Sequence, residues 1–283
     1  MRKPLPVIVL IAVLTLSLAG CAGGGNAAVT TATAGHEPGR PPVHYRDRVA
    51  VLMYHAFEEP PTSGFMVTKE EFEDHLQTLR EAGFHFISAD QFRAWKRGHG
   101  DLPPNAVLLT MDDGYREVRS VALPLLKKYD VPAIVFVPIR WVDRAPNIMS
   151  LDDLRVVQSN GVEVQSHTWN MHRRIRKPDG TTAAVVWTMS QSEMRTDAAR
   201  SRAVYKGWFG REPDMLAYPY GAFTPELIRA ARSEGIRFGF TTQPGLVTRD
   251  TPDMSLPRLN AGLRGQSGED VVQMILQHAR AGT

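Results

Sequence analysis

The chain has 283 residues, and 33 Lys and Arg against 30 Asp and Glu give a formal net charge of +3 at pH 7. The basic residues are scattered instead of forming a stripe, so composition gives no reason to expect a nucleic-acid partner. A single cysteine excludes a disulfide within one chain, and the fold must depend on its hydrophobic core. The one dense basic cluster, residues 173–177, indicates either contact with an anionic surface or a solvated loop.

The N-terminus predicts a secretory signal peptide over residues 1–20. Met1–Lys3 is basic, Val7–Leu18 is a short apolar run, and small residues precede Cys21. This run is too short to span a membrane comfortably, and an uncleaved signal anchor is the alternative interpretation. Residues 21–42 are rich in Gly, Ala, Thr and Pro and lack apolar periodicity, which predicts a flexible tether.

Residues 43–283 are expected to form one α/β domain, because strand-like and helix-like segments alternate along them. Apolar runs predict strands at 49–54, 84–88, 107–111, 131–137, 162–166 and 238–241. Helical spacing of apolar residues predicts helices at 68–83, 90–95, 118–129, 151–158, 191–209, 224–235 and 270–280. A capping box at Thr68–Glu71 begins the first helix, and a turn is expected at 216–221. The alternation predicts parallel strands with helices outside, as a barrel or an open sheet, with the site at the carboxyl ends of the strands.

Four residues at predicted strand ends are typical of a metal-dependent hydrolase. Asp112 and Asp113 directly follow the third strand, and His167 and His172 come after the fifth. A divalent metal needs neutral imidazoles and a carboxylate, and hydrolysis needs a separate base for the attacking water. Because the histidines are five residues apart, they would diverge by roughly 140° on a helix, so a loop must bring them together. The alternative for the aspartates is capping of the following helix.

Three motifs at these strand ends resemble those of the polysaccharide deacetylase family, also called the NodB-homology family or carbohydrate esterase family 4. They are Thr110–Gly114, Ser166–His172 and Ala217–Gly221, and the resemblance covers most of residues 48–280. The third motif, the spacing of the two histidines and Val51–His55 further resemble the poly-β-1,6-N-acetylglucosamine deacetylases within the family. The resemblance implies an α/β fold that is a distorted or incomplete (β/α) barrel.

The resemblance also implies a role for each motif residue. Asp113, His167 and His172 are expected to bind the metal, and Asp112 is expected to take a proton from the attacking water. The backbone N–H of Tyr220 is expected to hold the oxyanion, because the residue before it is a proline without an N–H. Zinc is the default metal, although two histidines and one aspartate also suit cobalt, nickel or iron. An ordinary turn with aromatic packing is the alternative for the Tyr-Pro-Tyr-Gly segment.

Two assignments stay open. The histidine that protonates the leaving amine is expected to be His55, at the end of the first strand, and His278 near the C-terminus is the competing candidate. Many family members have an arginine that orients the catalytic aspartate where this chain has Ala217. Arg258 is a candidate substitute, because a guanidinium can bind a carboxylate through two hydrogen bonds, and a surface ion pair is the alternative for it.

The expected function is removal of N-acetyl groups from poly-β-1,6-N-acetylglucosamine or a related exopolysaccharide. Trp169, Tyr218 and Arg258 are further candidates for contact with the substrate. One alternative is a deacetylase of peptidoglycan, chitin or xylan. The other is a non-catalytic polysaccharide-binding or export lipoprotein that retains a metal for structure.

Leu18–Cys21 resembles the lipobox of bacterial lipoproteins, which implies that Cys21 is lipidated and becomes the mature N-terminus. The protein is then expected outside the cytoplasm, attached to a membrane through its N-terminal lipid. Ala22 is not the aspartate that usually signals retention in the inner membrane, so the periplasmic face of the outer membrane is expected if the cell has one. Separate exopolysaccharide export proteins are candidate partners.

Overall fold

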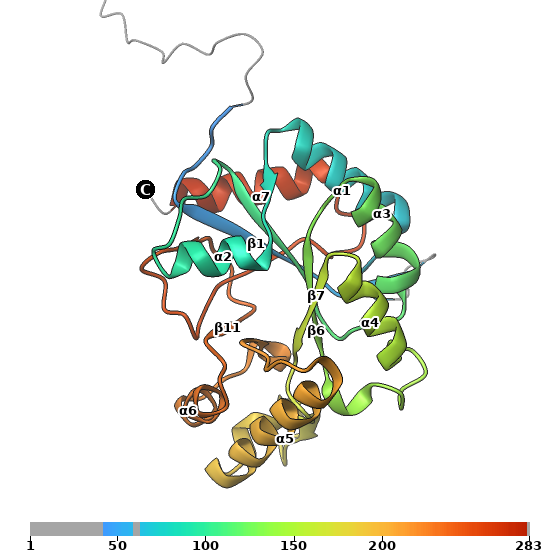
Figure 1. Ribbon diagram of the computed structural model, residues 1–283, viewed down its shortest axis with the longest axis vertical. Coiled ribbons are helices and arrows are strands. Elements are labelled where there is room, and N and C mark those ends of the chain that lie inside the picture. Colours follow the sequence, from blue (N-terminus) through green and yellow to red (C-terminus); the bar gives the residue numbers. More distant parts are fainter. Residues whose placement is uncertain (1–41, 59–62, 282–283) are drawn as a thin grey trace, which may run out of the picture. The chain divides into compact units, whose positions relative to one another are not determined.

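The structure of the protein is a computed structural model that describes residues 42–58 and 63–281 (Figure 1). The predicted signal peptide, the lipidated Cys21 and the tether up to residue 41 lie outside the described residues. The chain divides into two units, Met1–Pro38 and Gly39–Thr283, and every described residue belongs to the second. No helix among the described residues is long and apolar enough to cross a membrane.

Nine strands of the described chain form one mostly parallel sheet. They are β1 (Arg48–Tyr54), β4 (His85–Phe86), β5 (Ala106–Met111), β6 (Ala133–Val137), β7 (Val162–Ser166), β10 (Met215–Ala217), β11 (Phe238–Phe240), β12 (Val247–Thr248) and β13 (Leu259–Asn260). Their order is β11-β10-β7-β6-β5-β1-β12, with β4 beside β5 and β13 beside β1, and β12 runs antiparallel to β1. The sheet curls into a half-barrel whose end strands do not pair, which confirms the prediction of a distorted (β/α) barrel.

Side chains alternate between the two faces of the sheet along each strand, and an apolar cluster covers each face. In β1, Val49 and Val51 belong to an inner apolar cluster, which includes Phe238 and Phe240 from the far end of the sheet and lies inside the curl. Leu52, from the same strand, belongs to the larger cluster between the sheet and the helices. These two clusters explain why the sequence shows continuous apolar runs at the strands instead of alternation.

Seven α-helices lie in the described residues. They are α1 (Lys69–Glu81), α2 (Ala89–Lys96), α3 (Leu123–Lys128), α4 (Leu151–Ser159), α5 (Gln191–Phe209), α6 (Pro225–Ser233) and α7 (Gly268–Ala281). The capping box predicted at Thr68 is confirmed, and Ser88, Ser150 and Ser190 form three more at the starts of α2, α4 and α5. In Figure 1, α1, α3, α4 and α7 cover the outer face of the sheet, where their apolar residues share the larger cluster.

Some elements differ from the sequence prediction. The helix predicted at 118–129 begins as a π-helix at Val118–Ala122 before α3, and the segment expected as a turn contains β10 followed by a short 3₁₀ helix, η4 (Pro219–Gly221). The sequence did not indicate two small sheets, β2 (Ala56–Phe57) with β3 (Met66–Val67) and β8 (Arg174–Arg176) with β9 (Thr182–Ala184). The remaining 3₁₀ helices are η2 (Ile139–Trp141) and η3 (Val185–Thr188). Such short elements contain too few residues to show a period of their own.

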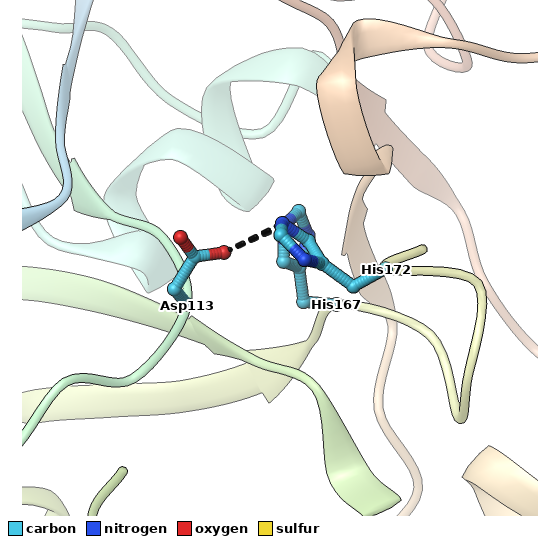
Figure 2. A group of neighbouring side chains, drawn as sticks. All are labelled: Asp113, His167 and His172. Atoms are coloured by element: carbon cyan, nitrogen blue, oxygen red, sulfur yellow. Dashed lines mark ion pairs between the residues drawn. The ribbon is translucent and has the colours of Figure 1, made fainter. Parts of the chain in front are cut away.

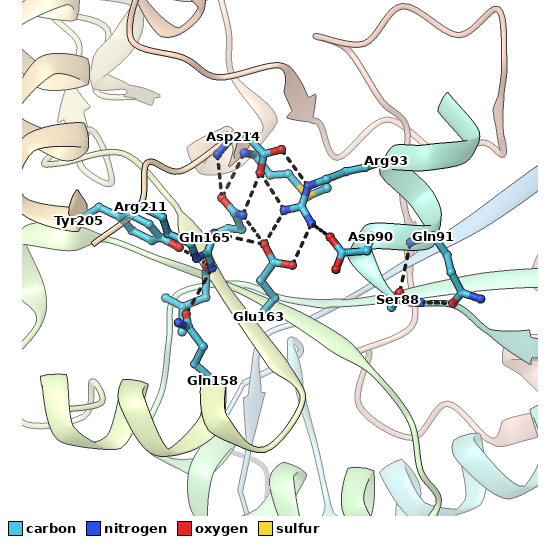
Figure 3. A network of polar contacts seen from close by, with 12 residues as sticks. Ser88, Asp90, Gln91, Arg93, Gln158, Glu163, Gln165, Tyr205, Arg211 and Asp214 are labelled. Carbon is cyan, nitrogen blue, oxygen red and sulfur yellow. Dashed lines mark hydrogen bonds and ion pairs between the residues drawn. The ribbon is translucent and has the colours of Figure 1, made fainter. Parts of the chain in front are cut away.

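Helix α2 packs against the inner side of the sheet and is fixed there by a polar network (Figure 3). Phe92 packs into the inner cluster, and the next residue, Arg93, reaches the start of the neighbouring strands. Arg93 donates to both carboxylate oxygens of Asp214 at 2.8 Å and to Glu163 at 3.0 Å. Buried Gln165 donates to the same two acids at 3.1 and 2.6 Å. The guanidinium of Arg93 therefore connects α2 to β7 and to the residue that precedes β10.

We expect Arg93→Met to lower the free energy of unfolding by about 2 kcal/mol, because Glu163 and Asp214 would stay close together without their shared cation. Arg93→Lys keeps the charge but not the forked donors, so its loss should be smaller. Urea unfolding monitored by circular dichroism measures both. A Met variant as stable as the wild-type protein would show that the network does not hold α2.

Candidate functional site

The carboxyl ends of β1, β5 and β7 meet at one edge of the sheet and supply the polar residues of the site. His55 follows β1, Asp112 and Asp113 follow β5, and His167 follows β7. The strands pair in parallel through β6, so their ends lie at the same level. The four residues line one cavity of about 450 Å³ together with His172.

The backbone turns sharply at two of these strand ends. Asp113 and Gly114 both adopt left-handed conformations, with φ of 69° and 67°, and Thr168 has φ of 70°. A Cβ on Gly114 would approach the side chain of Val137 to 3.0 Å, so the turn needs glycine there. Strand alternation alone would send consecutive aspartates to opposite faces, but this turn lets both line the cavity. A non-glycine residue in this conformation costs energy, which the surrounding contacts must offset.

Asp113, His167 and His172 form a group with the geometry of metal ligands (Figure 2). One oxygen of Asp113 lies 2.9 Å from Nε2 of His172 and 3.4 Å from Nε2 of His167. The three ligand atoms all lie within 4.8 Å of one another, and the loop after β7 lets the two histidines converge. Two imidazoles and one carboxylate that share a point in this way fit a divalent metal.

The contacts behind these ligands support the same interpretation. Nδ1 of His167 donates to the carbonyl oxygen of Ala217 at 2.7 Å, which orients the ring so that Nε2 faces Asp113. Burial opposes ionisation of Asp113, but hydrogen bonds and charges of His167 and His172 outweigh it and hold the pKa of this carboxyl well below its usual range. Asp113 therefore offers an ionised oxygen to a cation.

The loop between the two histidines is held by an acid from a distant helix. Asp197 of α5 accepts hydrogen bonds from the backbone N–H of Trp169 and of Asn170, each at 2.8 Å. Burial raises the pKa of Asp197 to about 6, although both N–H groups favour its charged form. Sequence reasoning missed this residue, since nothing in the pattern of α5 distinguishes it from a solvated acid.

Asp112 is paired with Arg258 in the interior. The guanidinium donates to both carboxylate oxygens, at 2.8 and 2.6 Å, and also to the carbonyl oxygen of Thr241 at 2.8 Å. Burial raises the pKa of Asp112, but the charge and hydrogen bonds of Arg258 outweigh this and lower it below its usual value. The Arg258 side chain is 0% exposed, so both a surface ion pair and substrate contact are wrong for it. The helix that follows the two aspartates has no side-chain cap, so the capping alternative is wrong too.

The two candidate histidines for proton transfer lie in different places. His55 lines the cavity, and its buried Nδ1 has no hydrogen-bond partner among the described residues. Burial lowers its pKa, while the charges of Asp112 and Asp113 partly offset this effect. His278 lies in α7, where Nδ1 is 2.9 Å from the carbonyl oxygen of Met274 in the preceding turn. His278 is not among the residues that line the cavity.

Tyr220 borders the cavity in a left-handed conformation, with φ of 59°. Its ring centroid lies 4.7 Å from that of His172, and its hydroxyl lies 3.4 Å from Nδ1 of the same histidine. Trp141 packs edge-on against the His172 ring at 4.9 Å. Sequence reasoning missed Trp141, although it follows the end of β6 as the motif residues follow their own strands.

The two aromatic residues predicted to contact substrate do not line the cavity. Tyr218 is fully buried, donates its hydroxyl to the carbonyl oxygen of Met254 at 3.0 Å and stacks on Phe223. Trp169 is partly buried against the outer core. Both are corrections to the sequence prediction, because aromatic residues beside a motif can face the core as easily as the ligand. The described aromatic residues that do line the cavity are Phe65, Tyr115 and Tyr220.

The fold and this site define a class of hydrolase, and comparisons with known proteins identify the family. A model of the polysaccharide deacetylase family matches residues 99–239. The poly-β-1,6-N-acetyl-D-glucosamine N-deacetylase of Staphylococcus epidermidis is 28% identical over 200 residues, which cover 69% of this chain and 68% of that protein. The chain belongs to the polysaccharide deacetylase family, whose members are hydrolases acting on amide bonds.

Solved structures agree on the fold. IcaB from Ammonifex degensii matches with a TM-score of 0.71 and 27% identity, covering 81% of this chain and 97% of that chain. A de-N-acetylase from Aggregatibacter actinomycetemcomitans matches with a TM-score of 0.71 and 24% identity, covering 81% of this chain and 100% of that chain. The half-barrel described above is therefore shared with these proteins of known structure.

We expect the purified domain to bind one Zn²⁺, and His172→Gln to weaken that binding by roughly 100-fold, because one of the three ligands is lost. Competition with a chromogenic chelator measures the affinity. His85→Gln, at an exposed histidine of β4, is the matched control and should bind like the wild-type protein. Unchanged affinity in the His172 variant would exclude this group as the metal site.

Proposed function

We propose that the protein is a divalent-metal-dependent deacetylase that removes N-acetyl groups from poly-β-1,6-N-acetylglucosamine or a closely related polymer. One observation carries the proposal: a carboxylate held ionised by a buried arginine lies beside a separate carboxylate with two histidines, in one open cavity. Base and ligand set are thus distinct groups, as amide hydrolysis with a metal requires.

Asp112 is the proposed base. Its pKa is lowered by Arg258, so it is ionised and able to accept a proton from water at neutral pH. Both of its oxygens are fixed by the guanidinium, which sets the direction of the remaining lone pairs. Arg258 therefore takes the place of the arginine that many family members have at the position of Ala217, and it acts as a positioning residue.

The ligand set Asp113, His167 and His172 would hold the metal, which supplies Lewis-acid activation of the water and of the acetamide carbonyl. Zinc is the proposed metal, and cobalt, nickel or iron would suit the same donors. The backbone N–H of Tyr220 is assigned to the developing oxyanion, because it borders the cavity and its neighbour Pro219 has no N–H.

His55 is the proposed donor of a proton to the leaving amine. It lines the same cavity, and one of its ring nitrogens has no partner among the described residues. Its lowered pKa makes the protonated ring a strong acid, while the nearby aspartates favour transient protonation. A proton taken up by Asp112 and one delivered by His55 complete the exchange of water for amine at the acetyl carbon.

The proposed polymer rests on resemblance within the family. The relative from Staphylococcus epidermidis is named for poly-β-1,6-N-acetyl-D-glucosamine, and it matches over about two thirds of its length. Val51–His55 places a histidine at the cavity from the first strand, as the sequence motif of that subgroup suggests. A lipid anchor on Cys21, a location outside the cytoplasm and export proteins as partners are part of the proposal on sequence grounds alone.

Acetate release tests the proposal. Residues 43–283 with Zn²⁺ should release acetate from β-1,6-linked N-acetylglucosamine oligomers, and chelation should abolish release. Asp112→Asn should lower kcat by roughly 100-fold or more while Zn²⁺ affinity stays intact, because a base is lost and no ligand is. Asp152→Asn, at an exposed aspartate of α4, is the control.

The alternatives appear as other outcomes of the same experiment. Faster release of acetate from peptidoglycan, chitin or acetylated xylan than from the β-1,6 oligomer would indicate that one of these polymers is the substrate. Binding of the glycan without acetate release under any metal would favour a non-catalytic binding protein. Full activity of the Asp112 variant would remove the proposed base.

The pH profile of kcat/KM tests the role of Arg258. Because the guanidinium lowers the pKa of Asp112, Arg258→Met should raise it and move the acid limb to higher pH by about one unit or more. Arg258→Lys retains the charge, so it should shift the acid limb of the pH profile less. This variant tests the same role if the Met variant does not fold. An acid limb that stays in place in a folded variant would show that Asp112 is not the titrating base.

A further inference from the structure

A second groove, of about 470 Å³, lies directly beside the catalytic cavity. Arg174 and Tyr220 line both, so the two form one continuous depression. The far side of the groove consists of Lys177, Thr182 and Trp187. A linear polymer with one unit at the metal site has a path for its next units along this groove.

The β8–β9 hairpin forms one wall of the groove. Side chains alternate along its strands, so its basic residues point outward. Ile175 packs toward the core under the hairpin, whereas Arg174 and Arg176 on either side of it are exposed. Arg174 pairs with Ala184 in the antiparallel register, and its guanidinium lies 4.6 Å from the centroid of the Tyr220 ring. This exposed cation, which lines both the cavity and the groove, is thus held in place by stacking.

The hairpin carries positive charge that the described residues do not neutralise. Arg174 donates a hydrogen bond to the hydroxyl of Thr182 at 3.3 Å, which does not neutralise its charge. Asp179, in the turn, accepts from the N–H and hydroxyl of Thr181 at 2.9 and 2.6 Å and pairs with no base. No ion pair within the described part of the chain involves Arg174, Arg176 or Lys177.

Trp187 adds an aromatic surface to this groove. Its side chain is 59% exposed, although a tryptophan is usually buried, and it sits on η3 directly after β9. An exposed aromatic ring at the border of a polar groove is suited to stacking against the face of a sugar ring. Stacking on the ring needs no charge on the sugar, whereas the neighbouring cations repel a sugar that is positively charged.

We propose that this groove is a subsite for the neighbouring unit of the polymer and that it favours an N-acetylated neighbour over a deacetylated one. The inference rests on the proposed function. Hydrolysis breaks the C–N bond of a neutral acetamide, forms a C–O bond from water to the acetyl carbon, and leaves acetate and an amine that takes up a proton. Each turnover thus places one new positive charge on the polymer. A unit with that charge is repelled by Arg174 and Lys177, so the enzyme modifies separated units instead of continuous runs.

Defined oligomers test this subsite. Wild-type enzyme is given the fully acetylated β-1,6 pentamer and a pentamer with one glucosamine, and tandem mass spectrometry locates the released acetyl groups. We expect kcat/KM for the unit next to glucosamine, on one side, to be lower by roughly five- to tenfold. The ratio of kcat/KM beside an acetylated neighbour to kcat/KM beside glucosamine should approach one in 0.5 M salt. The same should hold for the double variant Arg174→Gln/Lys177→Gln. Lys128→Gln/Arg155→Gln removes two exposed cations elsewhere on the domain and should keep the wild-type ratio.

Glycan affinity of the metal-free protein, measured by calorimetry, gives a readout that does not depend on turnover. The fully acetylated pentamer should bind more tightly than the glucosamine-containing one, and Trp187→Ala should weaken both by a similar factor. Acetate release at equal rates beside both kinds of neighbour, with equal affinities, overturns the subsite and leaves the proposed function standing. Absence of acetate release from every pentamer contradicts the proposed function, and the affinities then decide the subsite separately.

Discussion

The arrangement of the site depends on the buried ion pair between Asp112 and Arg258. Removing two charges from water is costly unless their hydrogen bonds are completed, and here the guanidinium is completed by Asp112, Thr110 and the Thr241 carbonyl. The pair joins the end of β5 to a segment 146 residues later, on the open side of the half-barrel where β11 and β12 do not pair. The interaction that keeps Asp112 ionised therefore also joins two distant parts of the fold.

This constraint explains how adjacent aspartates can differ in role. Asp112 remains in line with the strand and points to the arginine, whereas Asp113 takes the left-handed conformation and points to the histidines. Each carboxylate is kept ionised by a different partner, Arg258 in one case and the imidazoles in the other. The glycine that follows allows the turn without a clash against Val137. A single strand end thereby presents two carboxylates with separate surroundings.

Much of this could be predicted from the sequence, and the failures have a common physical cause. Long apolar runs and capping residues are local signals. They sufficed to predict the main strands, α1 and the strand-end position of His55, Asp112 and His167. Burial is not local: the sequence could not show that Tyr218 faces the core or that Arg258 is inaccessible to substrate. Asp197 and Trp141 act through distant or backbone contacts, and the hairpin strands are too short to show alternation.

The position of the hairpin connects the candidate metal site to the neighbouring groove. β8 begins two residues after the ligand His172, and Tyr220 contacts both His172 and Arg174. Tyr220 therefore packs against both the hairpin and His172, and the loop before His172 is restrained by Asp197. The same short segment carries His172 of the candidate metal site and the exposed cations of the groove. Packed side chains therefore connect the hairpin to the candidate metal ligands.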